Sequence, residues 1–259
     1  ALDLNTTGQS NVAVGTVTLG GNTTGIENTA SGRYAMRCNS TASYNTAFGA
    51  CSLFANTTGT RITAVGFKAL AANTCGNWNT AVGYIALASN TTGYHNTSIG
   101  YKALVTNTTG LNNTGSGFYS MLANTTGNNN VGYGGRALAS NTTANNNTAS
   151  GYSSLRANTT GHSNTASGYY ALGKNTTANN NTAQGFRAMC SNITGHSNTA
   201  VGMKALATNT CGCNNTAVGM CSLVSNISGG MNTAIGQASL FGNTCGWYNT
   251  SSGYNSMKC

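Results

Sequence analysis

The chain has 259 residues, of which only 5% are charged, and eleven Lys and Arg residues against two acids give it a net charge of +9. It contains 35 glycines and no proline, which is unlike an ordinary globular domain, and it has no apolar run of about 18 residues that could cross a membrane as a helix. With Asp3 and Glu27 as the only acids, it offers no carboxylate pair and no nucleophile with a base and an orienting group. We therefore expect no enzyme, no cofactor and no metal site.

A 17-residue unit repeats fifteen times from Asn5 to Cys259 without insertion or deletion. We call each unit a coil, number its positions 1 to 17 from its first Asn, and call the residues at one position of all coils a row. Row 1 is always Asn, row 11 always Gly and row 15 always Leu or Met, while residues 1–4 fill the end of a preceding coil. A fixed period indicates a repeat protein rather than disorder, so we expect a single repeat domain over residues 1–259. The coils start at residues 5, 22, 39, 56, 73, 90, 107, 124, 141, 158, 175, 192, 209, 226 and 243.

The period determines the fold class. Seventeen residues are too few for two packed helices, and abundant Gly, Asn and Thr oppose helix formation. They suit one coil of two or three short strands joined by tight turns and stacked about 4.8 Å from the next coil. The sequence therefore predicts an all-β fold, a β-solenoid or β-roll of fifteen coils without helices.

Within a coil, the rows predict what faces inward. Gly or Ala in row 4 and Gly in row 11 indicate turns with positive φ or a close backbone approach. Strand alternation places rows 7, 9 and 11 inside and rows 8, 10 and 12 outside. Row 15 is the one large apolar row, so it should point inward beside the small residues of rows 9 and 14, with a bend between rows 12 and 17. The Asn side chains of rows 1 and 7 can form ladders along the stack.

Row 1 begins Asn-x-Thr, Asn-x-Ser or Asn-x-Cys in all fifteen coils, whereas row 7 is usually followed by Thr-Ala. This contrast favours N-glycosylation once per coil, because the acceptor pattern is kept in one Asn row only. The alternative is a bare Asn ladder, in which a semi-buried position simply accepts small hydroxyl or thiol residues. The candidate glycosylation sites are Asn5, Asn22, Asn39, Asn56, Asn73, Asn90, Asn107, Asn124, Asn141, Asn158, Asn175, Asn192, Asn209, Asn226 and Asn243.

Row 12 carries large apolar residues, and the neighbouring row 10 carries Val, Ile, Phe and Tyr in many coils. Large exposed apolar stripes mark interfaces, so one interpretation is lateral packing of solenoids in a homo-oligomer. The other places row 12 in the solenoid's own core. The candidate interface residues are Phe67, Tyr84, Tyr101, Phe118, Tyr152, Tyr169, Phe186, Met203, Met220 and Tyr254.

Two weaker patterns leave alternatives open. Row 13 contains Lys68, Lys102, Arg136, Arg187 and Lys204, which either attract an acidic polysaccharide or nucleic acid or form a sparse solubilising row. Stacked Thr in rows 2, 3 and 8 either binds ice or reflects ordinary β-propensity. Rows 2 and 3 are adjacent and should face opposite ways, which disfavours a flat ice-binding array.

The number and placement of the cysteines indicate whether the protein is intracellular or extracellular. Nine is an odd number, and they fall on scattered rows, which favours an extracellular protein with some disulfides and at least one thiol unpaired or bridging chains. Cys211-Gly-Cys213, near His196, is a weak metal-like cluster that is better explained as Cys on a stacked turn.

The segment NTAVGYIALASNTTG, from Asn79 to Gly93, resembles the head repeats of trimeric autotransporter adhesins, and similar NTAxGxxAL arrays occur in bacteriophage tail fibres. The resemblance covers essentially the whole chain. It implies a stacked β-roll with Asn and Gly turns, and three rolls associated side by side.

We therefore expect an extracellular structural β-solenoid that forms a surface fibre or filament. Neither end carries a capping segment, which suggests a window of a longer protein or subunits stacked end to end. The expected partners are further copies of the chain and, in the glycosylated or adhesive forms, glycans, with no nucleic acid and no membrane span. The alternatives are an adhesin head that binds a host or glycan surface and, third, an ice-binding protein.

Overall fold

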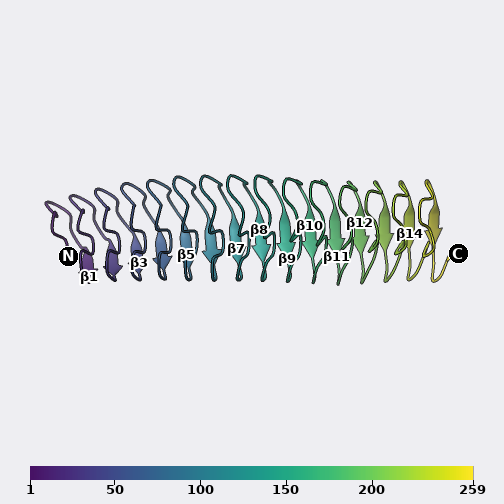
Figure 1. The fold of residues 1–259 in the computed structure, drawn as a ribbon, viewed down its shortest axis with the longest axis horizontal. Helices are drawn as coiled ribbons and strands as arrows, with labels where there is room; N and C mark the ends of the chain where they lie inside the picture. The colour runs from purple at the N-terminus through teal and green to yellow at the C-terminus, as the bar shows by residue number, and fades with distance from the viewer. Residues whose placement is uncertain (259) are drawn as a thin grey trace. The chain divides into compact units, whose positions relative to one another are not determined.

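The computed structural model describes residues 1–258, which contain fifteen short parallel strands and no helix. The chain divides into two compact units, an N-terminal unit over residues 1–129 and a C-terminal unit from residue 130 onward. The all-β solenoid predicted from the period is confirmed in both units (Figure 1). The N-terminal unit contains β1 (Val12–Val14), β2 (Thr29–Ser31), β3 (Thr46–Phe48), β4 (Thr63–Val65), β5 (Thr80–Val82), β6 (Thr97–Ile99) and β7 (Thr114–Ser116). The C-terminal unit contains β8 (Val131–Tyr133), β9 (Thr148–Ser150), β10 (Thr165–Ser167), β11 (Thr182–Gln184), β12 (Thr199–Val201), β13 (Thr216–Val218), β14 (Thr233–Ile235) and β15 (Thr250–Ser252).

Every strand occupies rows 8 to 10, and within each unit successive strands pair in register, 17 residues apart. Thr165 is the partner of Thr182, for example, and Ala166 of Ala183. The turns are also hydrogen-bonded to neighbouring coils: the Leu172 N–H donates to the Ala188 carbonyl of the next coil at 3.0 Å, and the Tyr170 N–H to the Tyr152 carbonyl of the preceding coil at 3.0 Å. Because the turns as well as the strands bond to the next coil, most of the backbone contributes to one ladder per unit.

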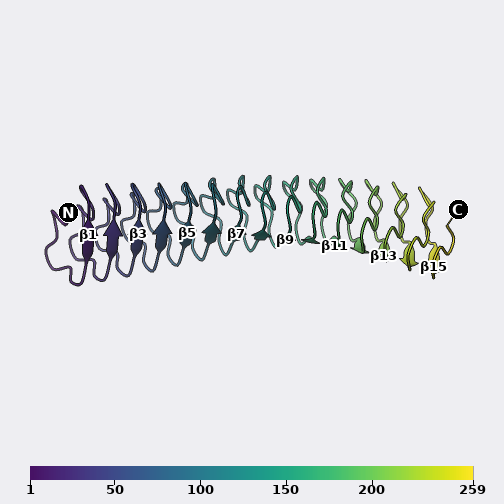
Figure 2. The ribbon, with the colours of Figure 1, turned by 90° about the horizontal axis from the view of Figure 1, so that it is seen from below.

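Each coil has a single three-residue strand, not the two or three that the sequence predicted. The reason is the backbone of rows 6, 13 and 15, where every residue has φ between 47° and 64° although none is Gly. Left-handed residues end an extended segment, so the chain bends repeatedly outside rows 8 to 10 (Figure 2). Each such non-Gly residue costs about 1 kcal/mol, which the stacked hydrogen bonds and the core must offset.

The core is made by rows 1, 4, 7, 9, 14 and 15, as the sequence predicted for rows 7, 9, 14 and 15. Row 11, which was also expected inside, is only half-buried in most coils. Leu172 and its neighbour Ala171 are both fully buried. Consecutive residues of an extended chain point to opposite faces, so two adjacent inward residues require the left-handed bends of rows 13 and 15. Row 12 lies outside the core, which excludes the second interpretation of that row.

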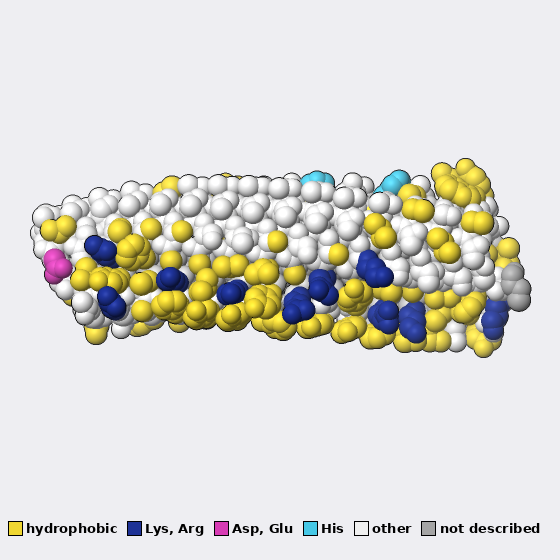
Figure 3. Space-filling view, viewed as in Figure 1, with side chains coloured by type: hydrophobic (Ala, Val, Ile, Leu, Met, Phe, Trp, Pro, Cys, Tyr) yellow, Lys and Arg dark blue, Asp and Glu magenta, His cyan; other side chains and the backbone are white. Residues whose placement is uncertain are grey.

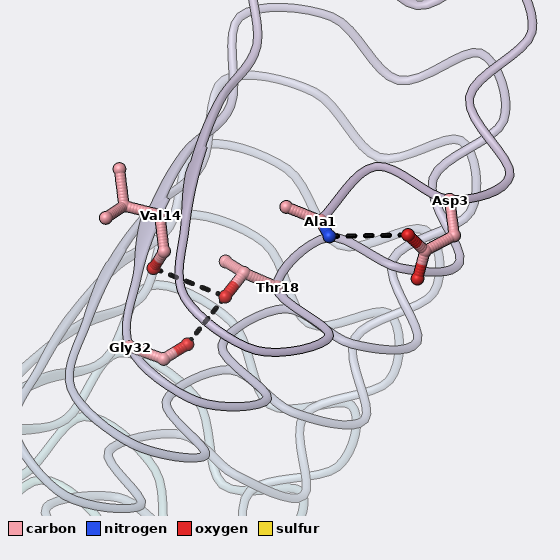
Figure 4. Close-up of polar contacts among 5 residues, drawn as sticks. All are labelled: Ala1, Asp3, Val14, Thr18 and Gly32. Carbon is pink, nitrogen blue, oxygen red and sulfur yellow. Dashed lines mark hydrogen bonds and ion pairs between the residues drawn. The ribbon is translucent and has the colours of Figure 1, made fainter.

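Row 14 is restricted to small residues because it lies against the backbone of row 11. Where it carries a hydroxyl, that group can bond a row 11 carbonyl: Thr18 donates to the Gly32 carbonyl at 2.8 Å (Figure 4). Ser154 donates to the Gly151 carbonyl at 2.9 Å. Ala, Ser and Thr therefore alternate in this row without leaving a buried hydroxyl unpaired.

Candidate interaction faces

The Asn side chains of row 1 form a ladder inside each unit. The Asn175 Nδ2 group donates to Asn158 Oδ1 at 2.9 Å and to the Ala178 carbonyl at 3.1 Å. The thirteen residues of this row from Asn22 to Asn226 are fully buried. The internal ladder, one of the two alternatives left open by the sequence, is the arrangement that these residues adopt.

This placement bears directly on the glycosylation expected for row 1. A glycan replaces one Nδ2 hydrogen and needs open space beside the nitrogen, whereas from Asn22 to Asn226 that nitrogen is enclosed and bonded. Asn5, in the first coil, is exposed, and Asn243, in the last, is half-buried. Asn5 still donates to the Gly8 carbonyl at 3.0 Å. For the enclosed residues, the fold therefore leaves no room for a glycan on the side-chain nitrogen.

Row 7 forms a second internal ladder that meets the first. The Asn181 N–H donates to Asn164 Oδ1 at 3.0 Å, and Asn164 Nδ2 donates to the Ala178 carbonyl at 2.8 Å. The row 4 carbonyl of Ala178 thus accepts one hydrogen bond from each Asn row. Two amide ladders therefore converge on the row 4 turn, which explains why row 4 holds only Gly or Ala.

Ile62 interrupts the row 7 ladder in one coil. Its side chain is 1% exposed and has no oxygen to accept from the N–H of Asn79 in the next coil. Burying an Ile side chain is worth about 1.5–3 kcal/mol, and a net hydrogen bond about 1 kcal/mol. The apolar contact therefore offsets the bonds that this one coil lacks.

Rows 10 and 12 flank the row 11 glycines and form an outward apolar face, which we call the apolar face. Phe67, Tyr84 and Tyr101 of the N-terminal unit are between 40% and 46% exposed. In the C-terminal unit, Tyr169 is 49% exposed and Phe186 46%. Hydrophobic side chains gather along one margin of each unit in the drawn view (Figure 3). All ten candidate interface residues are exposed, as an interface row requires.

The rings of row 12 stack along the solenoid. The centroid of the Tyr84 ring lies 5.4 Å from that of Phe67 and 5.5 Å from that of Tyr101, with interplanar angles of 20° and 8°. Tyr169 lies in the same way between Tyr152 and Phe186. Because the faces of the inner rings cover one another, the outward surface presents ring edges. Such a surface suits packing against another protein face better than stacking of a sugar or a base.

Row 6 departs from its usual Asn or Ser in five consecutive coils; the first carries Glu27, and the other four carry Tyr44, Arg61, Trp78 and His95. The Arg61 guanidinium lies 5.5 Å from the Tyr44 ring and 5.7 Å from the Trp78 ring. The Trp78 and His95 rings stack at 5.0 Å with an interplanar angle of 3°. We call these four residues the row 6 patch, a continuous cation–π and aromatic stack on the surface of the N-terminal unit.

All five cations of the N-terminal unit contact aromatic rings: Arg33, Arg37, Arg61, Lys68 and Lys102 lie over rings at 4.6–5.7 Å. The Arg33 guanidinium also donates to the Tyr34 hydroxyl at 3.2 Å. That hydrogen bond lowers the pKa of Tyr34 and raises that of Arg33. Of the two acids, Asp3 pairs with the α-amino group of Ala1 at 3.3 Å (Figure 4).

The Thr rows differ in how their hydroxyls are used. In row 2, Thr159 Oγ1 donates to the Thr176 carbonyl at 3.1 Å, and Thr91 Oγ1 to the Thr108 carbonyl at 3.2 Å. Row 8 lies on the outer face of the strands, beside row 10. Row 10 varies from Ser167 to Phe48 and Tyr133, so the strand surface is not the uniform flat array that ice binding would require.

The cysteines do not form the disulfides expected from the sequence. All eight that the structure describes are unpaired, and Cys259 lies outside the described residues. The His196 N–H donates to Cys213 Sγ at 3.4 Å. Across residues 1–258, no group of three His, Cys, Asp or Glu side chains is placed to hold a metal ion. Nor does that part of the chain contain a helix that could cross a membrane.

Comparison with known proteins gives no relative. No protein-family model matches the chain. No curated protein matches it. No solved structure matches it either.

Proposed function

We propose that the chain is a structural protein whose copies associate side by side through the apolar face to build an extracellular fibre. The observation that carries this proposal is the exposed, stacked aromatic row 12 with the apolar row 10 beside it. Burying one large apolar side chain is worth about 1.5–3 kcal/mol. A soluble chain that repeats such side chains coil after coil gains more from association than from exposure. The resemblance to adhesin heads favours three copies in cross-section.

Self-association is tested by sedimentation velocity across a range of protein concentrations. We expect the unaltered chain to sediment as an oligomer, and the double variant Tyr84→Ser/Tyr101→Ser to dissociate about 10- to 100-fold more readily. A factor of ten corresponds to about 1.4 kcal/mol, so two rings suffice for this change. Electron microscopy of the same samples should show fibres for the unaltered chain only.

The matched control is Tyr44→Ser/Tyr94→Ser, which removes two exposed tyrosines of the same unit from rows 5 and 6. It should associate like the unaltered chain. The proposal fails if the unaltered chain remains a 26.2 kDa monomer at every concentration, or if both double variants dissociate equally.

A second candidate function is adhesion, favoured by the row 6 patch. Surface residues that depart together from a repeat pattern are candidates for specific recognition, since stacking of the coils does not require them. The exposed edge of the Trp78 indole and the Arg61 guanidinium offer hydrogen-bond donors to a glycan or a protein surface.

Adhesion is tested on immobilised glycans and host-surface proteins. We expect Trp78→Ala to reduce binding at least about tenfold, as is typical when a recognition hot spot is truncated. Trp247→Ala, at an exposed row 5 position of the C-terminal unit, is the control and should bind normally. Adhesion through this patch is rejected if the unaltered chain binds none of the surfaces or if the two variants bind equally.

A further inference from the structure

The C-terminal unit carries a row of cations without counter-charges. Both acids of the chain, Asp3 and Glu27, lie in the N-terminal unit. The part of the chain from residue 130 onward contains six Lys or Arg residues and no acid. On the face drawn in Figure 3, Lys and Arg side chains recur along the C-terminal unit, and no Asp or Glu appears there.

Five of these cations fall in five consecutive coils: Arg136, Arg156, Lys174, Arg187 and Lys204. All five belong to the bend formed by rows 13 to 17, and all except the half-buried Arg136 are exposed. Coils are stacked at the spacing of neighbouring strands, so the track carries one positive charge per about 4.8 Å. We call these five residues the cationic track.

The centre of the track is hollowed. One cavity of about 360 Å³ is lined by Arg156, Tyr170 and Lys174, with Gly173 in its wall. A second, of about 270 Å³, is lined by Tyr169, Tyr170, Lys174 and Arg187. Lys174 and Tyr170 belong to both, so the two cavities are neighbours. The Tyr170 ring lies against Gly173, where an added Cβ would approach it to 2.5 Å, and the absence of a side chain there leaves room for the ring.

The track differs from the cations of the N-terminal unit. There, all five lie over aromatic rings and contribute to surface packing. In the C-terminal unit, within residues 130–258, the only such contact is between Lys258 and Phe241, at 6.0 Å, outside the track. The five track cations therefore have neither a ring nor a carboxylate as a partner, and their charge is available to a ligand.

We propose that the cationic track binds an anionic polysaccharide, whose carboxylate or sulfate groups follow one another along the solenoid. Charge spacing favours this class of polymer, because a chain bearing about one charge per sugar presents charges at intervals of the same order as the coils. Duplex DNA carries one charge per about 1.7 Å of axis, which is much denser than the track. The covered faces of the Tyr169 ring also offer no platform for a nucleobase. This inference does not depend on the proposed self-association.

The test measures binding of the full chain to polygalacturonate and to heparin by isothermal titration calorimetry at several salt concentrations. The site variant is Arg156→Gln/Lys174→Gln/Arg187→Gln. The control variant is Arg33→Gln/Arg61→Gln/Lys68→Gln, which lowers the net charge by the same three units but in the N-terminal unit. Circular dichroism establishes that both fold, and sedimentation velocity establishes that their oligomeric states match.

We expect the site variant to lose affinity at least about tenfold and to show a weaker salt dependence, because it forms fewer ionic contacts. The control should change less than about threefold. A preference for polygalacturonate or for heparin identifies carboxylate or sulfate as the natural group. Equal losses in the two variants, equal binding of neutral dextran, or tighter binding of single-stranded DNA than of either polysaccharide would each overturn the proposal.

Discussion

Gly168→Ala is expected to lower the free energy of unfolding by about 3 kcal/mol or more, whereas Gly161→Ala in the same coil should change it by less than about 1 kcal/mol. Both substitutions add one methyl group to a glycine of the repeat. Only the first, in row 11, adds it at φ of +128°. Comparing the two variants therefore distinguishes a glycine that is required for its backbone conformation from one that is required only for its small size.

The physical difference lies in the backbone conformation, because at both positions a new methyl group meets backbone atoms of the next coil. At Gly168 it would lie 2.5 Å from the carbonyl oxygen and 2.7 Å from the carbonyl carbon of Gly185 in the next coil. These are backbone atoms held in the ladder, so two coils would have to separate. At Gly161 a methyl also meets the next coil, yet coils 9 and 11 carry Ala144 and Ala178 in this row. Small backbone shifts evidently accommodate Ala in row 4.

The measurement is urea unfolding followed by far-UV circular dichroism on both variants and the unaltered chain. A shift of the midpoint at constant slope reports stability alone. Equal losses for the two variants would show that row 11 has no special conformational requirement. A loss below about 1 kcal/mol for Gly168→Ala would show that neighbouring coils separate easily.

The sequence predicts most of the structure of a coil, because each inward row repeats one chemical type of residue. The Leu or Met of row 15, the Gly of row 11 and the alternation through rows 7 to 12 are sufficient for the solenoid, whereas the exposed position of row 12 is decided only by the structure. The two or three strands per coil that the sequence predicts are wrong, since each coil has one. Rows 6, 13 and 15 adopt left-handed backbone with residues such as Trp78, Lys102 and Leu104, and these residue types carry no local signal for that conformation.

The Asn rows show a second feature that the sequence alone does not determine. Asn-x-Thr in row 1 is compatible with a glycan on the surface and with a ladder in the core, because both use the same three residues. Only the burial of residues such as Asn158, with its amide between two acceptors, distinguishes them. The cationic track was likewise obscured in sequence, because its members lie in rows 13, 16 and 17 and share a surface only when the bend is folded.

The buried amide of Asn158 leads to the second large effect: Asn158→Asp should destabilise the chain by about 3–5 kcal/mol at pH 7. The Asn158 Nδ2 group donates to Asn141 Oδ1 at 3.0 Å and to the Gly161 carbonyl at 2.9 Å. In the variant a carboxylate oxygen would face these two acceptor oxygens in a fully buried site. Repulsion and desolvation both disfavour the charged form, so the folded-state pKa of the new carboxyl is raised above its unfolded value of about 3.9.

The sign of the pH dependence follows from that raised pKa. The folded state binds the proton more tightly than the unfolded state, so lowering the pH toward about 4 favours folding of the variant. Most of the loss should therefore be present at pH 7 and disappear progressively as the pH falls through the folded-state pKa. A residual loss of about 1–2 kcal/mol should persist in acid, because a protonated carboxyl has one donor where the amide has two.

The control is Asn180→Asp, at an exposed row 6 position of the next coil, whose side chain is open to solvent. It introduces the same charge and should change stability by less than about 0.5 kcal/mol at either pH. Urea unfolding of both variants at pH 7 and pH 4 is the measurement. If Asn158→Asp were no less stable than Asn180→Asp at pH 7, the row 1 amides could not be the enclosed ladder that joins one coil to the next. Their Asn-x-Thr pattern would then again be open to a surface role.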